Sequence, residues 1–292
     1  MATNRALKGR IRSINNTRKI TRTMELVATS KLKRAQDRVA AARPYAQALT
    51  EVMADLATPD LAAEFPWLRT PAKPSEGGPA VAVVILITSN RGLAGGFNSN
   101  LIKEARRRIE ALTAEGYQVE LIGIGKKGIG FFRYVGRKFR SERVDIGDRP
   151  TPDHAASVVD DLLRDFAEGR IGVVELVQSR FISVLNSPPA TIRMLPIERP
   201  ATKTGMKPDY ILAPDAATLL GALLPLYVRN TLFRGMVETV AAEQAARRTA
   251  MKNATDNAGD LLERLKRTYN RQRQAQITQE IAELVGGAAA LE

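Results

Sequence analysis

The run GIGKKG, residues 123–128, has the glycine spacing G-x-G-x-x-G of dinucleotide-binding loops. It follows a predicted strand and opens a predicted helix, where backbone N–H groups can bind a pyrophosphate. Asp145 lies about as far along the chain as the acidic residue that holds a ribose. Against such a site, the motif follows the second predicted strand of its domain, and two lysines and a short helix make a weak dinucleotide crevice. The alternative, a tight strand-to-helix turn, stays open.

A second glycine-rich loop, SNRGLAGGFNSN at residues 89–100, follows the first predicted strand of the same domain. Its backbone amides could surround an anion at the start of a helix. The loop lacks the G-K-[ST] ending of a phosphate-binding loop, so neither the lysine nor the magnesium-binding hydroxyl is supplied. We interpret it as a structural turn and keep Arg91 as its one candidate residue.

Catalytic and metal-binding chemistry has little support in the sequence. The chain contains one histidine, His154, and no cysteine. A metal site built from several imidazoles or from thiolates is therefore unavailable, and no motif supports a Ser-His-Asp assembly. We predict no catalytic residue, no cofactor and no metal ion.

The longest apolar run, AVAVVILI at residues 80–87, is too short to span a bilayer, and the first residues lack the apolar segment of a signal peptide. The absence of cysteine fits a reducing compartment. We therefore expect a soluble intracellular protein that can dock on a larger body.

The charge is concentrated at the two ends of the chain. The whole sequence carries 44 Lys and Arg against 31 Asp and Glu, a net charge of +13. Residues 1–43 hold twelve basic and two acidic residues, and RLKRTYNRQR at 264–273 is a second basic cluster. So uneven a charge indicates either a solvated helical face or an acidic partner.

Two long helices are predicted at the ends of the chain. In the first 56 residues the steps between seam positions are three or four, the spacing of a coiled coil. The C-terminal helix should begin after a cap at Asp215 and run to about Val285. The clearest part of its seam is Met251, Ala254, Ala258, Leu261, Leu265 and Tyr269, and Ile277, Ile281 and Leu284 continue it. The N-terminal seam is Leu7, Ile11, Ile14, Arg18, Thr21, Met24, Ala28, Leu32, Ala35, Val39, Ala42, Ala46, Leu49, Met53 and Leu56.

Strands and helices alternate between these two helices, which predicts an α/β domain with a parallel, Rossmann-like sheet. Neither terminal helix can bury its stripe alone, so we expect them to pair as an antiparallel coiled coil. The expected division is an N-terminal helix over 1–58, a linker over 59–79, a globular domain over 80–206 and a C-terminal helix over 207–292.

Three segments resemble the gamma subunit of bacterial F-type ATP synthase, in the family's order and over nearly the whole chain. They are LKGRIRSINNTRKITRTMELVATSKLKRAQ, SNRGLAGGFNSN and AMKNATDNAGDLL with the later YNRQRQAQITQEIAELVGGAAAL. The terminal segments are highly specific and the middle one is looser. One departure is Thr249, where relatives often have an apolar residue.

The resemblance implies a central rotor stalk. In that family the paired terminal helices form a shaft inside a ring of alpha and beta subunits, and the α/β domain rests on the c-subunit ring and holds the epsilon subunit. Proton flow turns the ring and the shaft, and rotation drives the beta subunits through different nucleotide affinities for ATP synthesis. A non-catalytic, peripheral subunit at the cytoplasmic face of the bacterial inner membrane is implied, with membrane contact only through the complex.

The same resemblance assigns contacts to particular residues. Met24, Lys31, Lys33 and Arg34 match the region that faces an acidic helix-turn-helix of beta.

At the other end of the chain, Arg273, Gln274 and Thr278 match a contact with a beta catch loop, and LVGGAAALE matches a tip held in an apolar bearing. Tyr210, within KPDYILAPD at 207–215, matches the foot segment near the c ring and epsilon.

Two other functions remain open from the residues themselves. GIGKKG favours a dinucleotide-dependent α/β enzyme, and the basic N-terminal helix favours a coiled-coil protein that binds nucleic acid. Few aromatic residues are present for base stacking and no known nucleic-acid module occurs, so we expect no nucleic-acid partner.

Overall fold

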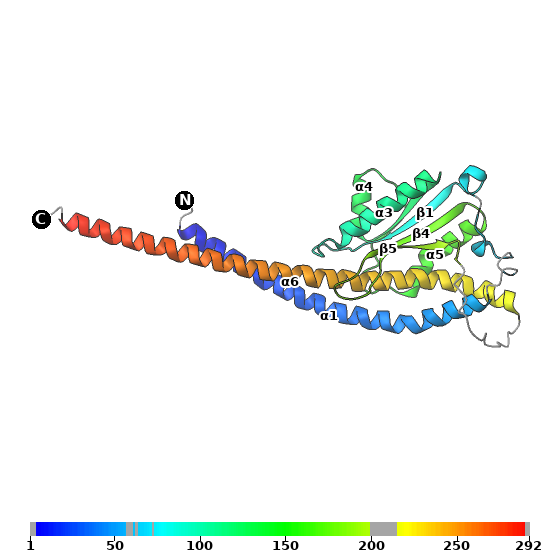
Figure 1. The fold of residues 1–292 in the computed structure, drawn as a ribbon, viewed down its shortest axis with the longest axis horizontal. Helices are drawn as coiled ribbons and strands as arrows, with labels where there is room; N and C mark the ends of the chain where they lie inside the picture. Colours follow the sequence, from blue (N-terminus) through cyan, green and yellow to red (C-terminus); the bar gives the residue numbers. More distant parts are fainter. Residues whose placement is uncertain (1–3, 57–60, 62–63, 72, 199–214, 290–292) are drawn as a thin grey trace. The chain divides into compact units, whose positions relative to one another are not determined.

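The computed structural model describes residues 4–56, 61, 64–71, 73–198 and 215–289, the last four of these by their backbone alone (Figure 1). The chain forms two compact units, one of Met1–Thr29 with Arg247–Glu292 and the other of Ser30–Ala246. The elements are, in order, α1 (Asn4–Leu56), the 3-10 helices η1 (Pro66–Leu68) and η2 (Pro74–Glu76), β1 (Val81–Ile87), α3 (Phe97–Ala114), β2 (Gln118–Ile124), α4 (Lys126–Tyr134), β3 (Phe139–Arg143), α5 (Pro152–Ala167), β4 (Ile171–Ser179), β5 (Pro189–Leu195) and α6 (Ala216–Ala289).

The five strands form one sheet in the order β3-β2-β1-β4-β5. β1 pairs in parallel with β2 and β4, and β2 pairs in parallel with β3, whereas β5 runs antiparallel to β4. Every residue of β4 is buried, as expected for a parallel strand covered on both faces. The predicted α/β sheet is confirmed, and its parallel pairing holds for β1 to β4. The antiparallel pairing of β5 and the short charged strand β3 were not predicted.

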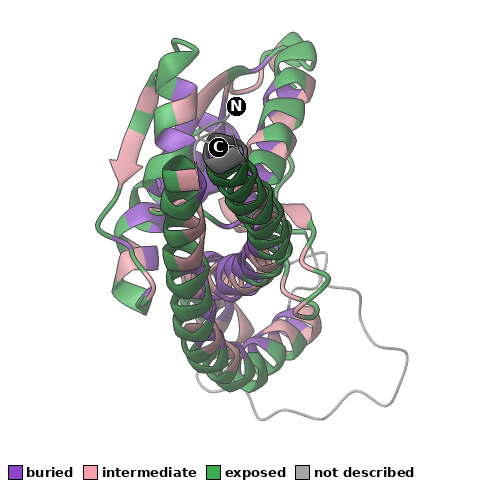
Figure 2. Cartoon of the chain, turned by 90° about the vertical axis from the view of Figure 1, so that its left-hand side faces the viewer, coloured by how far each residue is buried: buried purple, intermediate pink, exposed green. Residues whose placement is uncertain are grey.

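Two apolar cores cover the two faces of this sheet (Figures 1 and 2). On one face, α3 and α4 pack through residues such as Leu101, Ile109 and Phe132. On the other face, α5 and the parts of α1 and α6 within the Ser30–Ala246 unit share a single core. Members of that core on the terminal helices are Leu49, Met53, Leu56, Leu220, Leu224, Val228, Leu232 and Met236.

A buried charge interrupts the apolar face that α3 covers. Glu175 of β4 receives two hydrogen bonds from Arg108, at 2.8 and 2.6 Å, and a longer one from Arg193 of β5 at 3.4 Å. The pairing explains how a carboxylate is tolerated inside a fully buried strand, because its oxygens remain hydrogen-bonded. It also raises the pKa of Arg108.

In the unit of Met1–Thr29 and Arg247–Glu292, α1 and α6 pair in antiparallel fashion. The Thr255 hydroxyl donates to the Thr21 hydroxyl at 2.8 Å, and Asn4 Nδ2 donates to Gln276 Oε1 at 2.5 Å. Partner numbers fall along α6 as they rise along α1, which confirms the predicted antiparallel coiled coil. In the other unit the same order holds, since Ala35 and Val39 cluster with Val237 and Ala241.

Between Met251 and Leu262 the seam of α6 differs from the predicted one at two positions, each displaced by one residue along the helix. Leu262 is 4% exposed and Leu261 is 46% exposed, and Thr255 lies buried in the seam. The seam therefore runs through Met251, Thr255, Ala258 and Leu262, all of which are buried. A threonine can occupy it because its hydroxyl lies 2.8 Å from both the Met251 carbonyl oxygen and the Thr21 hydroxyl and so has hydrogen-bond partners when buried. In α1 the predicted seam holds except at Arg18, which is exposed.

The polar stretch MKNATDNAGDLL, residues 251–262, lies inside α6 and does not interrupt it. Helix α6 also carries a stretch that is long and apolar enough to cross a membrane, with a mean hydropathy of 1.2 over 18 residues. Of that stretch 22% is buried in the protein, and Leu220, Leu224 and Val228 of this helix belong to the core.

Two glycines of α6 provide a matched test of this packing. A Cβ on Gly259 would come no closer than 3.8 Å to Arg18, whereas a Cβ on Gly235 would lie 2.2 Å from Gln178 Oε1. Both alanine substitutions gain the same helix propensity. Gly259→Ala should therefore raise the free energy of unfolding by up to about 1 kcal/mol, and Gly235→Ala should lower it by about 1–3 kcal/mol. Urea unfolding measures both, and equal effects would contradict the close approach at Gly235.

Candidate functional site

The three glycines of GIGKKG are explained by packing. A Cβ on Gly123 would lie 2.6 Å from Ile129 Cγ1, and one on Gly125 would lie 2.0 Å from the Thr88 carbonyl oxygen. Gly125 also has a φ of 97°, which L side chains rarely adopt. A Cβ on Gly128 would approach Thr88 to 2.9 Å. The glycines thus allow β1, β2 and α4 to approach closely.

The backbone donors of the same motif are already used within the protein. Gly125 N–H donates to the Arg143 carbonyl at 2.9 Å, and Lys126 N–H donates to Asn90 Oδ1 at 3.0 Å. The next two amides, of residues 127 and 128, donate to the Ser89 carbonyl at 3.1 Å and the Thr88 hydroxyl at 2.9 Å. A pyrophosphate would have to displace these bonds.

Asp145, the candidate ribose ligand, is held by Arg143. The guanidinium donates to both carboxylate oxygens, at 2.9 and 2.7 Å. These bonds, with the nearby charge, lower the pKa of Asp145 to about 2. The carboxylate serves an ion pair beside β3, which gives it a structural role.

The second glycine-rich loop is tethered by its own polar side chains. Asn98 accepts from the Ser89 amide at 3.0 Å, and Asn90 donates to the carbonyls of Val144 and Ile146 at 3.1 and 3.2 Å. Helix α3 begins at Phe97, with Gly96 at the cap position. Leu93 in this loop is exposed and has a φ of 64°.

The crevice at the carboxyl ends of the parallel strands is the usual ligand site of an α/β sheet. Here α6 supplies one wall of it, through Met236, Thr239 and Val240. A cavity of about 340 Å³ remains, lined also by Arg91 and Lys126. This volume is near the lower limit of small-molecule pockets.

His154 completes a helix cap. Its Nδ1 accepts from the Thr151 amide at 3.1 Å, while its own amide donates to the Thr151 hydroxyl at 3.4 Å. Among the described residues, no group of three or more His, Asp or Glu side chains could hold a metal ion.

The candidate interface residues of α1 fall into two kinds. Met24 is half-buried, and Lys33 and Arg34 are exposed. Lys33 pairs with Asp37 at 2.9 Å, one helical turn further on. Lys31 instead bonds within the chain to Asp148, and its side chain is only 34% exposed.

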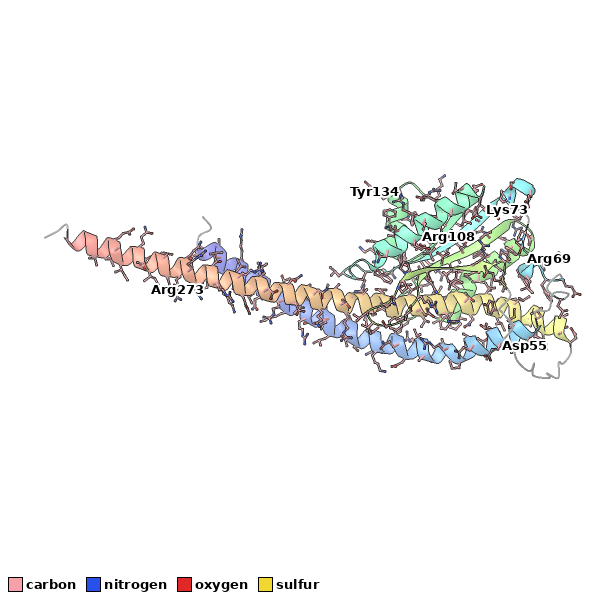
Figure 3. The ribbon with its side chains drawn as sticks, in the orientation of Figure 1. Asp55, Arg69, Lys73, Arg108, Tyr134 and Arg273 are labelled. Atoms are coloured by element: carbon pink, nitrogen blue, oxygen red, sulfur yellow. The ribbon has the colours of Figure 1, made fainter. Side chains whose placement is uncertain are left out.

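The candidate residues of α6 all lie on its exposed surface. Arg273 (labelled in Figure 3) and Gln274 are exposed, as is Thr278, whose hydroxyl donates to the Gln274 carbonyl at 3.0 Å. Tyr210 lies outside the described residues.

Large apolar residues are exposed on both terminal helices. Those of α1 were not predicted, whereas Ile277, Ile281 and Leu284 of α6 were expected to continue its buried seam, an expectation that the structure contradicts. Ile20, Leu26 and Val27 of α1 are exposed among basic side chains, and Ile277, Ile281, Leu284 and Val285 of α6 are exposed towards its carboxyl end. The signal for the α1 residues was available, because all three lie off the coiled-coil seam. Large exposed apolar side chains that gather on one surface mark a protein interface.

The fold and these surfaces define a class of protein in which an α/β domain is inserted between two paired terminal helices. The sequence model of the ATP synthase family matches residues 3–291. The ATP synthase gamma chain of Gemmatimonas aurantiaca is 60% identical over the full length of both chains, and that of Leptospira biflexa is 41% identical over the same share. The chain belongs to the ATP synthase gamma chain family.

Solved structures share the fold at lower identity. A chain of the Euglena gracilis mitochondrial ATP synthase, in a structure of OSCP, F1 and c-ring, has a TM-score of 0.70 at 19% identity and covers 99% of this chain and 94% of its own. A chain from the central stalk and c-ring of the Tetrahymena thermophila enzyme has a TM-score of 0.57 at 20% identity, covering 80% and 99%. Neither the dinucleotide enzyme nor the nucleic-acid binder is supported.

The ion pair at Asp145 predicts a pH response. The pKa of Asp145 in the folded protein lies below the ordinary 3.8. The ion pair therefore stabilises the folded state fully above pH 3.8, and this stabilisation is lost as the pH falls towards about 2. In NMR titration from about pH 5 to 3, the Asp145 carboxyl should scarcely titrate. Arg143→Gln should bring its midpoint back towards 3.8. Arg137→Gln, at an exposed position, is the control, and an unchanged midpoint in Arg143→Gln would contradict the assignment.

The different surroundings of Lys31 and Arg34 predict different costs of charge reversal. Lys31→Glu places a carboxylate beside Asp148 and should lower the free energy of unfolding by about 1 kcal/mol. Arg34→Glu, at an exposed residue without an ion-pair partner among the described residues, should stay within about 0.5 kcal/mol of the parent. Thermal unfolding at low salt and at about 1 M salt measures both. The difference should shrink at high salt, and identical melting curves at low salt would refute it.

Proposed function

We propose that this chain is the central rotor stalk of a proton-translocating ATP synthase, coupling rotation of the c ring to the conformational cycle of the catalytic beta subunits. One observation carries the proposal: the exposed surfaces of both terminal helices are basic and interspersed with apolar residues. Exposed basic residues include Arg5, Lys8, Arg10, Arg12, Lys19, Arg22, Arg264, Lys266, Arg267, Arg271 and Arg273. Family membership supports it, because the full-length relatives are gamma chains.

The physical requirements of a rotor agree with these helices. A shaft must interact differently with alternative states of the surrounding subunits, since only differential affinity shifts a conformational equilibrium. Exposed ion pairs are individually weak, so a basic surface can attract acidic loops without locking onto them. Exposed apolar residues such as Leu26 and Val27 would add to that attraction by an amount that depends on the shape of the partner surface.

We assign the partners by surface. The alpha and beta subunits surround the terminal helices, with Met24, Lys33 and Arg34 towards beta and Arg273, Gln274 and Thr278 at a beta catch loop. Lys31 contributes indirectly, because it holds Asp148. The end of α6, with exposed Leu284 and Val285, would sit in an apolar bearing.

The α/β domain would rest on the c ring and hold the epsilon subunit, with Tyr210 in the segment between them. On this proposal residues 1–58 and 207–292 form the shaft, 80–206 form the foot and 59–79 link them. The complex lies at the cytoplasmic face of the bacterial inner membrane, and the chain touches the membrane only through it. Bond chemistry belongs to the beta subunits, and this chain contributes no catalytic residue.

Reconstitution tests the proposal. The chain should assemble with the alpha and beta subunits of the same organism and restore ATP-driven proton pumping to membranes that carry the c ring. Recovery only as a free monomer, without effect on ATP hydrolysis by the alpha–beta hexamer, would sink the proposal. The paired variant Lys33→Glu with Arg34→Glu should reduce pumping by roughly two- to five-fold, as expected from losing exposed attractions of about 0.5–1 kcal/mol.

The matched control is Arg106→Glu, which reverses an exposed charge on α3 that pairs with Glu110 at 3.8 Å. This control should leave pumping unchanged, and both variants should melt near the parent temperature. Equal losses of pumping in the control and in the shaft variant would contradict the assignment of the shaft surface to beta.

A further inference from the structure

Three contacts join the carboxyl end of β4 to one turn of α6. The Ser179 amide donates to the Thr239 hydroxyl oxygen at 3.2 Å, and the Phe181 amide donates to Glu238 Oε2 at 3.4 Å. Gln178 Oε1 lies 2.2 Å from the position of a Cβ on Gly235. We refer to Gln178, Ser179 and Phe181 with Gly235, Glu238 and Thr239 as the β4–α6 contact.

The polar groups of this contact are unusually deep. Gln178, Ser179 and Thr239 are 4%, 1% and 2% exposed. Apolar contacts between a helix and a sheet are non-directional, whereas a buried hydrogen bond is lost when its donor and acceptor turn away from each other. Burying polar groups here therefore favours one arrangement of α6 over its neighbours. Gln178 Oε1 itself has no hydrogen-bond partner among the described residues.

The spacing of the contact residues along α6 fixes the rotation of this helix about its own axis. Gly235, Glu238 and Thr239 are separated by three and four residues, so they share one face of the helix. A turn of one residue moves each side chain by about 100° around the axis. It would bring Arg234 or Met236 against β4, where not even a single methyl group fits.

The loop after β4 extends the contact to α1. The Phe181 side chain packs against a buried cluster of Ala35 and Val39 from α1 with Val237 and Ala241 from α6. The same short stretch of chain thus holds both helices of the pair within the Ser30–Ala246 unit.

We propose that the β4–α6 contact is the rotational lock through which torque passes between the α/β domain and α6. Thr239 is its central positioning residue, because its hydroxyl oxygen accepts the hydrogen bond of the Ser179 amide. It has no role in bond chemistry. The proposal rests on the rotor function. It assigns these residues to coupling between foot and shaft, separate from the surfaces that face other subunits.

The test uses the assembled complex and measures ATP hydrolysis and ATP-driven proton pumping on the same preparation. Thr239→Val removes the acceptor at nearly constant volume, and Thr239→Ser retains it. Glu238→Gln is a second variant that keeps the shape of the side chain and weakens its acceptor. The control is Thr231→Val, which removes an α6 hydroxyl whose partner among the described residues is the Tyr227 carbonyl of its own helix, at 2.9 Å.

Thr239→Val should lower protons pumped per ATP hydrolysed by roughly half or more, because the buried Ser179 amide loses its partner and α6 can slip under load. Glu238→Gln should lower it less, and Thr239→Ser and Thr231→Val should match the parent. A lower melting temperature with unchanged pumping per ATP, in Thr239→Val or in Glu238→Gln, would show a merely structural role and overturn the proposal. Failure of the parent chain to support pumping would instead refute the rotor function.

Discussion

Burial of the stripes on the two terminal helices is the constraint on which the other features depend. Helices of 53 and 74 residues cannot be stabilised by propensity alone, so they need an apolar partner along much of their length. Leu49 and Met53 of α1 meet Leu220 and Leu224 of α6 in one core with the sheet. The domain between the two helices must therefore bring the chain back to α1, so that α6 can pack against it. An inserted α/β domain whose β4 and β5 end close to α6 fulfils this requirement.

The sequence predicted what depends on repetition and missed what depends on individual contacts. The α1 seam and the buried strand β1 follow from periodicity and from an unbroken apolar run. Leu262 could not be distinguished from Leu261, because the choice depends on a buried Thr255 whose hydroxyl meets Thr21 on the other helix. Strand β3, FRSER, resembles a loop by composition. Its ion pairs, such as Arg140 with Glu120 of β2, become evident only when the fold brings the partners together.

The glycine motif shows why a spacing alone does not define a ligand site. Glycines let a loop bind a pyrophosphate because they allow close backbone approach and a positive φ. Here the same properties make room for the backbone and side chain of Thr88. Counting backbone donors separates the two cases, since those of residues 125–128 already have protein acceptors. The candidate interface residues are different in kind. The exposure of Lys33, Arg34 and Arg273 follows from the helical period, but the partners proposed for them would lie on other chains, which one sequence does not contain.

The pairing of Asn4 with Gln276, 272 residues apart, also sets an order of events during synthesis. At roughly 5–20 residues per second, the ribosome completes the partner of the first helix on the order of tens of seconds after that helix has emerged. Leu32 and Val39, buried in the finished protein, have no α6 to pack against throughout that interval. The part of the chain made first is thus among the last to gain its native structure, and a cell must protect a basic, amphipathic segment until the final residues are made.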